Sequence, residues 1–315
     1  MAAPRTILVT GATGYIGGRL VPRLVEKGRP VRVLARDPDR VRSRSWSERV
    51  KVAVGDVLDL AALAEALDGV GTAYYLVHSM GSGPGFHELD VRAAHTFGQA
   101  AANAGVEHII YLGGLGAGAN LSPHLRSRQE CGEALRQGGV AVTEFRAAVV
   151  VGAGSISFEM VRYLVERLPV MVCPRWVYSR VQPIAVDDLL DYLVSALDFP
   201  ACRGRTIEVG GRDVTTYGGM MLGYARARGL HRLMLAVPVL TPRLSSYWVH
   251  WFTPIPTDIT RALVEGLRND VVVTDDLAHR LFPHIEPQDY ASAIGGVLEE
   301  LRRSSGGSGL AAPSV

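Results

Sequence analysis

A glycine pattern near the start of the chain constrains its fold more than any other feature. Three glycines stand at a G-x-x-G-x-x-G spacing in Thr10-Gly11-Ala12-Thr13-Gly14-Tyr15-Ile16-Gly17. An apolar run at 5–10 precedes the pattern, an amphipathic stretch at 15–27 follows it, and a second apolar run covers 30–35. A glycine turn between a strand and a helix, followed by a second strand, is typical of a parallel strand–helix–strand unit.

The same glycines predict a dinucleotide site. The first permits a tight turn, the second lets the backbone approach a pyrophosphate, and the third lets the helix pack closely on the sheet. The helix N-terminus adds unpaired N–H groups and a favourable dipole for phosphates. The residues that we expect to contact the dinucleotide here are Gly11, Thr13, Gly14, Tyr15, Ile16 and Gly17. A glycine turn that binds no ligand is the alternative.

The alternation of apolar runs and helical stretches continues for about two hundred residues and predicts an α/β fold, a Rossmann-type doubly wound parallel sheet of about seven strands. Expected strands cover 5–10, 30–35, 50–54, 72–77, 107–112, 140–146 and 205–209. Expected helices cover 15–27, 59–67, 86–104, 124–137, 157–167 and 186–197. We assign 1–210 to this domain, 211–303 to a small, mainly helical C-terminal lobe that shares 147–185, and 304–315 to a flexible tail.

Composition excludes several classes of function. The chain has 33 lysines and arginines against 31 acidic residues, a net charge of +2, which gives no general case for nucleic-acid binding. Its three cysteines lack metal-ligand spacing, so we expect no metal and a reducing, cytoplasmic setting. We see no secretory signal, and arginines and prolines interrupt the most apolar stretch, 230–256, which argues against a transmembrane segment.

The end of the second expected strand discriminates between cofactors. NAD sites usually place a carboxylate there for the ribose 2′-hydroxyl. This chain has Ala35 followed by Arg36, whose guanidinium suits a 2′-phosphate, so NADP(H) is favoured over NAD(H). In the alternative interpretation, Arg36 only pairs with Asp37 or Asp39.

A second adenosine contact is expected after the third strand, at Asp56 and Val57. Asp56 would hold the adenine edge. It could instead cap the helix that begins near Asp59.

Four motifs together resemble the extended and atypical short-chain dehydrogenase/reductases, particularly their NmrA-like, NAD(P)H-binding branch. They are the glycine pattern and the segments 108–116, 182–188 and 237–246. The resemblance runs from Thr10 to about Asp276 and implies a Rossmann fold that binds NAD(P)H.

In catalytic members of that superfamily, a Ser or Thr ends the fifth strand and a Tyr-x-x-x-Lys motif opens the next helix. Here the strand ends in Gly113-Gly114, with Gly113 expected beside the cofactor. Alignment with the family motif puts His124 at the tyrosine position and Arg128 at the lysine position. The only lysines, Lys27 and Lys51, lie in the nucleotide-binding half.

These departures leave three candidate catalytic residues. Arg128 would hold the nicotinamide ribose but cannot shuttle a proton. His124 could exchange one near neutral pH, or be a surface residue in the first turn of its helix. His78 lies after the fourth strand, where ligands of parallel sheets bind, and would contact the nicotinamide or only shape the pocket.

The downstream half supplies candidate substrate contacts. Arg146 should lie at the same sheet edge as the nicotinamide. Apolar pocket walls, or simply core, are expected from Phe158, Met160, Tyr163 and Met171. The aromatic cluster Tyr247, Trp248, Trp251 and Phe252 could form a lid, a homodimer surface, a peripheral membrane contact through 243–256 or the core of the lobe.

Three functions remain open from the sequence. The leading one is an NADP(H)-dependent oxidoreductase that acts on an apolar carbonyl or conjugated small molecule. The second is a non-catalytic NADP(H)-binding redox sensor or assembly protein, which the missing Ser, Tyr and Lys favour. The third is a redox-neutral epimerase or isomerase that recycles its cofactor.

Overall fold

A computed structural model describes residues 5–78, 85–116, 118, 121–237 and 253–305. Its centre is a seven-stranded sheet of order β11-β6-β5-β4-β1-β2-β3, in which every neighbouring pair is parallel. Its strands are β1 Thr6–Thr10, β2 Val31–Ala35, β3 Lys51–Val54, β4 Val70–Tyr75, β5 His108–Gly114, β6 Ala141–Ala147 and β11 Thr206–Val209. The predicted Rossmann-type fold class is confirmed.

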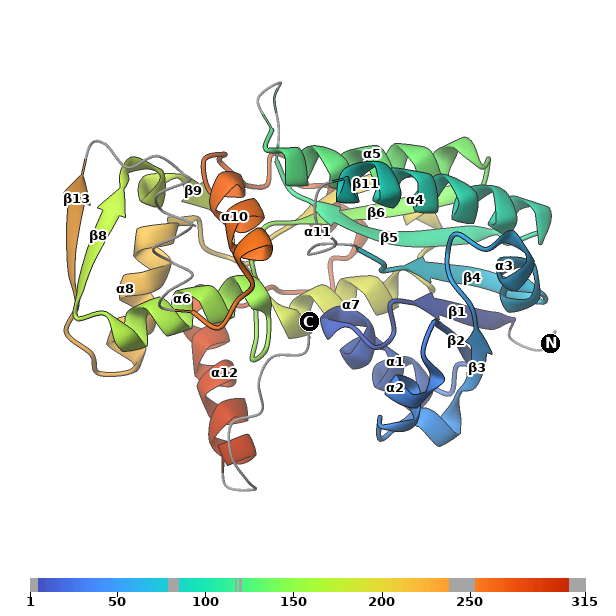
Figure 1. The fold of residues 1–315 in the computed structure, drawn as a ribbon, viewed down its shortest axis with the longest axis horizontal. Helices are drawn as coiled ribbons and strands as arrows, with labels where there is room; N and C mark the ends of the chain where they lie inside the picture. The colour runs from blue at the N-terminus through green and yellow to red at the C-terminus, as the bar shows by residue number, and fades with distance from the viewer. Residues whose placement is uncertain (1–4, 79–84, 117, 119–120, 238–252, 306–315) are drawn as a thin grey trace.

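Helices cover both faces of this sheet (Figure 1). One face carries α1 (Tyr15–Glu26) and α7 (Val186–Ser195), and the other carries α3 (Leu60–Leu67), α4 (Phe86–Asn103) and α5 (Pro123–Gln137). A short helix, α2 (Pro38–Arg42), follows β2. Because β5 is covered on both faces, all its residues are buried, which explains why the sequence there is an almost continuous apolar run.

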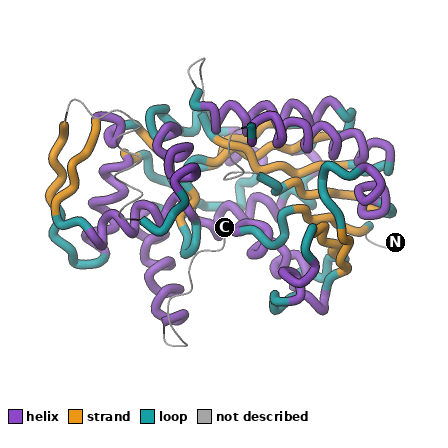
Figure 2. The backbone as a smooth tube through the Cα atoms, in the orientation of Figure 1, coloured by secondary structure: helices purple, strands orange, loops and turns teal. Residues whose placement is uncertain are grey.

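A second hydrophobic core lies beyond the carboxyl end of the sheet, where several further helices pack together (Figure 2, in which all helices are purple). These helices are α6 Ile156–Arg167, α8 Tyr217–Ala227, α10 Thr257–Gly266 and α12 Tyr290–Ser305. The helix α11 (Leu277–Leu281) instead packs on the central sheet, beside β11. The second core therefore combines chain from before and after the segment that forms α7 and β11.

Three two-stranded sheets accompany these helices. Two are parallel pairs, β7 (Val150–Val151) with β10 (Ile184–Ala185) and β8 (Val170–Pro174) with β13 (Leu233–Val237), while β9 (Arg180–Val181) pairs antiparallel with β12 (Thr215–Thr216). The sequence pattern did not predict these pairs, because strands of two to five residues carry too few alternations to be distinguished from loop. Within the described chain, no helix is long and apolar enough to cross a membrane.

Polar contacts join the Rossmann helices to the second lobe. The guanidinium of Arg19, on α1, donates hydrogen bonds to the carbonyl of Ala153 at 2.7 Å and to Glu300 of α12 at 2.7 Å. On α7, Asp188 accepts a hydrogen bond from the backbone N–H of Gln288 at 2.8 Å. These contacts fix the lobe against the edge of the sheet at which ligands of parallel sheets bind.

Candidate functional site

A cleft of about 400 Å³ lies between the carboxyl ends of the sheet strands and the second lobe. One wall comes from the glycine loop and the ends of β4, β5 and β6. The other comes from α6, α8 and α10. Of the residues predicted to bind cofactor or to act in catalysis, those that line the cleft are Gly11, Gly14, Tyr15, Ile16, Gly17, His78, Gly113, His124 and Arg128.

The glycine loop has the close contacts that its pattern predicts. Gly11 has φ of +66°, and a Cβ there would lie 2.5 Å from the carbonyl oxygen of Leu76. A Cβ on Gly17 would lie 2.2 Å from the carbonyl oxygen of Gly11. Gly14 is the N-cap of α1 and no side chain caps the helix, so its first N–H groups remain for an anion. The loop therefore fits the pyrophosphate of a dinucleotide.

Arg36 follows β2 with its side chain 80% exposed, and its nearest ionic partner is Asp56 at 3.8 Å. The two acidic neighbours are engaged elsewhere: Asp37 caps α2, and Asp39 pairs with Arg42 at 2.5 Å. Asp59, rather than Asp56, caps α3. The guanidinium of Arg36 is thus exposed and is not engaged by Asp37 or Asp39.

Two further residues predicted to contact the cofactor, Thr13 and Val57, do not line the cleft. Thr13 offers its carbonyl to the guanidinium of Arg44 at 2.6 Å, a contact that the sequence pattern did not reveal. Val57, beside Asp56, packs against the core under α3 and α4.

His78 leaves the end of β4 and lines the cleft. Its Nδ1 lies 2.7 Å from Oδ2 of Asp90, a residue of α4 that is only 3% exposed. Its Nε2 is buried and has no hydrogen-bond partner among the described residues. Burial lowers the pKa of His78, as does Arg128, while Asp90 raises it. Asp90 could not be predicted from the sequence, because one acidic residue in an amphipathic helix carries no signal until its partner is known.

His124 stands in the first turn of α5, whose N-cap is Ser122. Its ring lies 5.1 Å from that of His78, centroid to centroid, and its buried Nδ1 has no partner within the described structure. Burial is the main cause that lowers its pKa to about 3; His78 and Arg128 act in the same direction, and Asp90 acts against them. The structure thus turns His124 toward the cleft rather than toward solvent, and keeps it neutral.

Arg128 lies one helical turn after His124 and lines the same wall. Its guanidinium donates a hydrogen bond to the carbonyl of Leu112 and lies 5.4 Å from the centre of the Tyr111 ring. The Tyr111 hydroxyl in turn donates to the Arg128 carbonyl at 2.7 Å. These contacts hold a fixed positive charge at the end of β5.

Close neighbours explain the two glycines that end β5, a buried carboxylate for the first and a leucine for the second. Glu144 of β6 is fully buried and pairs with Arg136 at 2.8 Å and Arg146 at 2.7 Å. A Cβ on Gly113 would lie 2.8 Å from Oε1 of Glu144, and one on Gly114 would lie 2.9 Å from Leu125. A serine or threonine at either position would therefore require its neighbours to move. Arg146, expected at the cofactor edge, is used in this ion pair.

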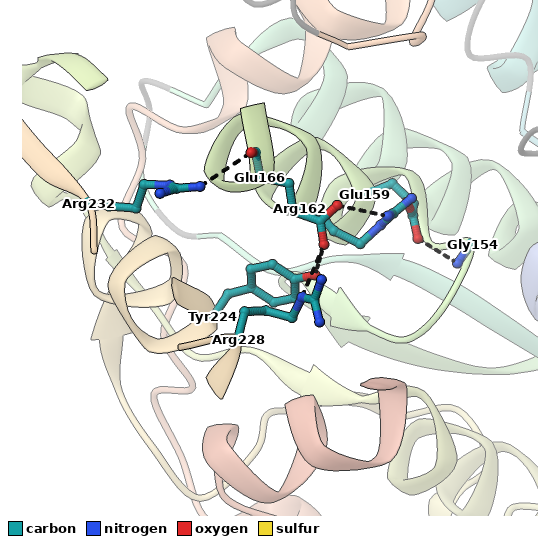
Figure 3. A network of polar contacts seen from close by, with 7 residues as sticks. All are labelled: Gly154, Glu159, Arg162, Glu166, Tyr224, Arg228 and Arg232. Atoms are coloured by element: carbon teal, nitrogen blue, oxygen red, sulfur yellow. Dashed lines mark hydrogen bonds and ion pairs between the residues drawn. The ribbon is translucent and has the colours of Figure 1, made fainter. Parts of the chain in front are cut away.

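The segment between β7 and α6 is fixed by a buried network (Figure 3). Glu159 accepts a hydrogen bond from the N–H of Gly154 at 3.0 Å and pairs with Arg162 at 2.6 Å. Further along α6, Glu166 accepts from the Tyr224 hydroxyl at 2.6 Å. The network positions Gly154 and the following residues, which line the cleft.

The lobe-side wall of the cleft is mainly apolar, with Ser155 and Ser157 at the start of α6 as its hydroxyl groups besides that of Tyr217. Side chains from its three helices include Met160, Val161, Tyr217, Ile259, Leu263 and Leu267. Of the four apolar residues proposed from the sequence as walls, only Met160 lines the cleft. Phe158 and Met171 belong to the core, and Tyr163 packs under Arg162 and Arg167. The aromatic cluster Tyr247, Trp248, Trp251 and Phe252 lies outside the described residues.

Comparison with known proteins agrees with this geometry. Residues 11–155 match a family described as NAD(P)H-binding. The chain is 34% identical over 219 residues to (4-alkanoyl-5-oxo-2,5-dihydrofuran-3-yl)methyl phosphate reductase of Streptomyces griseus, covering 67% of this chain and 69% of that protein. The glycine loop, the parallel sheet and these matches define an NAD(P)H-binding Rossmann protein. The chain belongs to the atypical short-chain dehydrogenase/reductase family.

Other relatives and solved structures extend the comparison. Ceramide reductase of Caulobacter vibrioides is 26% identical over 239 residues, covering 74% of this chain and 73% of that protein. Triphenylmethane reductase from Citrobacter has the same fold, with a TM-score of 0.75, 20% identity, and coverage of 93% of this chain and 99% of that one. The NADPH complex of an Escherichia coli quinone oxidoreductase gives a TM-score of 0.73 at 17% identity, with the same coverage.

Proposed function

We propose that this protein is an NADPH-dependent reductase of an apolar carbonyl or conjugated small molecule. The observation that carries the proposal is one cleft in which the glycine loop meets an apolar wall from α6, α8 and α10. When NADPH is bound, its nicotinamide supplies the hydride. The chain's own residues position the acceptor, exclude water and handle the proton.

The preference for NADPH rests on the end of β2. Ala35 supplies no carboxylate for a ribose 2′-hydroxyl, and Arg36 extends into solvent with one ionic contact among the described residues, at 3.8 Å. Gly11, Gly14 and Gly17 would hold the pyrophosphate. Arg128 would lie against the nicotinamide ribose, where its charge is fixed by the Leu112 carbonyl.

The substrate class rests on the opposite wall. Arg128 is the one lysine, arginine or carboxylate side chain among the described residues that line the cleft, and both histidines have lowered pKa values. A cationic substrate would lose hydration there without ionic compensation, and Arg128 is the one site for an anionic group among these residues. The Streptomyces relative's name describes a phosphate ester of an unsaturated lactone that is conjugated to an alkanoyl group. The conjugated lactone is an acceptor of the class proposed, whereas the phosphate is a charged group in addition to it.

The test is NADPH oxidation by the purified chain across a panel of alkyl ketones, aryl ketones, enones and quinones. We expect saturable turnover with at least one apolar acceptor, and weaker turnover with NADH. Leu263→Asn should raise KM for that acceptor several-fold and leave the Kd for NADPH unchanged, because Leu263 lies on the α10 wall.

Leu222→Asn is the matched control, since Leu222 is 39% exposed on α8 and outside the cleft. Tight NADPH binding without turnover on any acceptor would exclude the reductase and favour the redox sensor, whose affinities for NADPH and NADP⁺ should differ.

A further inference from the structure

The proton donor is the part of the chemistry that the resemblance leaves open. The chain has histidine and arginine at the positions of the family's tyrosine and lysine, and Arg128 does not give up a proton. Two imidazoles, His78 and His124, remain in the cleft wall. The two rings differ in whether a carboxylate lies at hydrogen-bond distance, and this difference selects the proton donor.

Within the described residues, His78 is the one of the two imidazoles that has a carboxylate at hydrogen-bond distance. Asp90 lies 2.7 Å from His78 Nδ1 and is absent from the cleft lining. A carboxylate accepts hydrogen bonds, so Nδ1 carries the proton and Nε2, on the opposite edge of the ring, is the nitrogen left for a ligand. Nε2 is buried and has no partner in the described part of the chain. A ligand oxygen in the cleft would give it one.

The charges around the two rings favour His78 as well. Arg128 disfavours a proton on either ring and Asp90 favours it, but Asp90 is hydrogen-bonded only to the His78 ring of the two, and His124 also faces His78. The titratable groups whose pKa values Asp90 influences, besides the two histidines, are Tyr75, Tyr111 and Cys131; they stay neutral because burial raises their pKa values. His124 can therefore orient a ligand as a neutral ring, and His78 can hold a proton transiently.

We propose that Asp90 and His78 form a proton-transfer dyad that takes the place of the tyrosine–lysine pair, with His78 as the catalytic residue and Asp90 as its positioning residue. The inference rests on the proposed reductase function. The acceptor carbon takes the hydride and its two electrons from the cofactor. The Nε2–H bond of protonated His78 breaks as an O–H bond forms on the acceptor, Asp90 stays ionised, and water later returns a proton to His78.

The test combines nitrogen NMR of the histidine rings with kinetics. In the wild type we expect the His78 tautomer with its proton on Nδ1. In Asp90→Asn, the amide can donate to Nδ1, so the proton should move to Nε2 and the pKa of His78 should fall. The rate of reduction should drop by about 100-fold, as expected for loss of acid–base catalysis. The Kd for NADPH should not change.

The pH profile separates this role from a structural one. The wild-type rate should fall as pH rises past the pKa of His78, which lies below its ordinary value of 6.5. In Asp90→Asn that fall should move to lower pH. His78→Gln, which keeps Asp90, should lower the rate of reduction by the same factor and remove its pH dependence. Glu88→Gln, an exposed carboxylate on the same helix, is the matched control and should change neither readout.

The possible results are distinguishable. Wild-type turnover that survives both Asp90→Asn and His78→Gln would overturn the dyad and leave the reductase intact. An Nε2–H tautomer of His78 in the wild type would also overturn it. No wild-type turnover on any acceptor would remove the reductase, and the dyad with it. If Asp90→Asn does not fold, the His78→Gln rate and the wild-type tautomer still decide.

Discussion

At the scale of single residues, the cofactor site depends on atoms that are absent from particular side chains as much as on the groups that are present. Gly11 and Gly17 lack the Cβ atoms that would collide with backbone 2.5 and 2.2 Å away. Gly113 lacks the one that would meet Glu144. In the proposed function, Ala35 lacks the carboxylate that would repel a 2′-phosphate, and Arg36 would meet that phosphate.

Arg36→Gln should therefore weaken NADPH binding by about tenfold or more, the loss of a charge-assisted hydrogen-bond pair to phosphate, and leave NADH binding nearly unchanged. The measurement is titration of each cofactor by fluorescence or calorimetry. Arg42→Gln is a suitable control because Arg42 is engaged by Asp39. Equal loss for both cofactors in Arg36→Gln would contradict a role in 2′-phosphate recognition.

At the scale of elements, α6 connects the second lobe to the cleft. The ion pair of Glu159 and Arg162 is buried, with side chains 4% and 9% exposed, and Glu159 also holds the N–H of Gly154. A buried charge that loses its partner is costly, whereas an exposed pair such as Glu299 and Arg303 on α12 contributes little.

Glu159→Ala should lower the free energy of unfolding by roughly 3 kcal/mol, the lower end of the range for breaking a buried pair, since Arg162 keeps Glu166 at 3.4 Å. Chemical denaturation measures the change. Glu299→Ala should leave the denaturation midpoint within error. A loss no larger in Glu159→Ala than in that control would show that the network does not stabilise the lobe.

At the scale of the whole molecule, buried histidines couple the stability of the fold to pH. His108 is 1% exposed on β5, with Nε2 2.7 Å from Oγ1 of Thr143. Burial lowers its pKa from 6.5 to about 4, and Arg203 contributes. Because the unfolded chain takes up this proton at higher pH than the folded chain, stability is present above pH 6.5 and is lost as pH falls toward 4.

The loss attributable to His108 is roughly 3 kcal/mol across that window, and His78 and His124 act in the same direction. In His108→Gln the free energy of unfolding should depend less steeply on pH between 6.5 and 4. The exposed His279→Gln should keep the wild-type slope. An unchanged slope in His108→Gln would mean that His108 does not govern acid stability.

The sequence by itself determined the Rossmann class and the glycine loop. Both depend on local features, namely apolar periodicity and glycines at fixed spacing, which act within one strand–helix–strand unit. It also predicted His78 at the carboxyl edge of the sheet, where ligands of parallel sheets bind. The positions of His124 and Arg128 came from the family motif, and a surface position for His124 stayed open.

Only the tertiary structure decided which of these groups have partners. Asp90 behind His78, Arg44 beside Thr13 and Glu144 beneath Gly113 join residues from different elements, between 12 and 31 positions apart. The apolar wall combines α6 with α8 and α10, and α7 and β11 of the Rossmann domain lie between α6 and α8 in the sequence. Such contacts arise from long-range packing, and no local pattern encodes them.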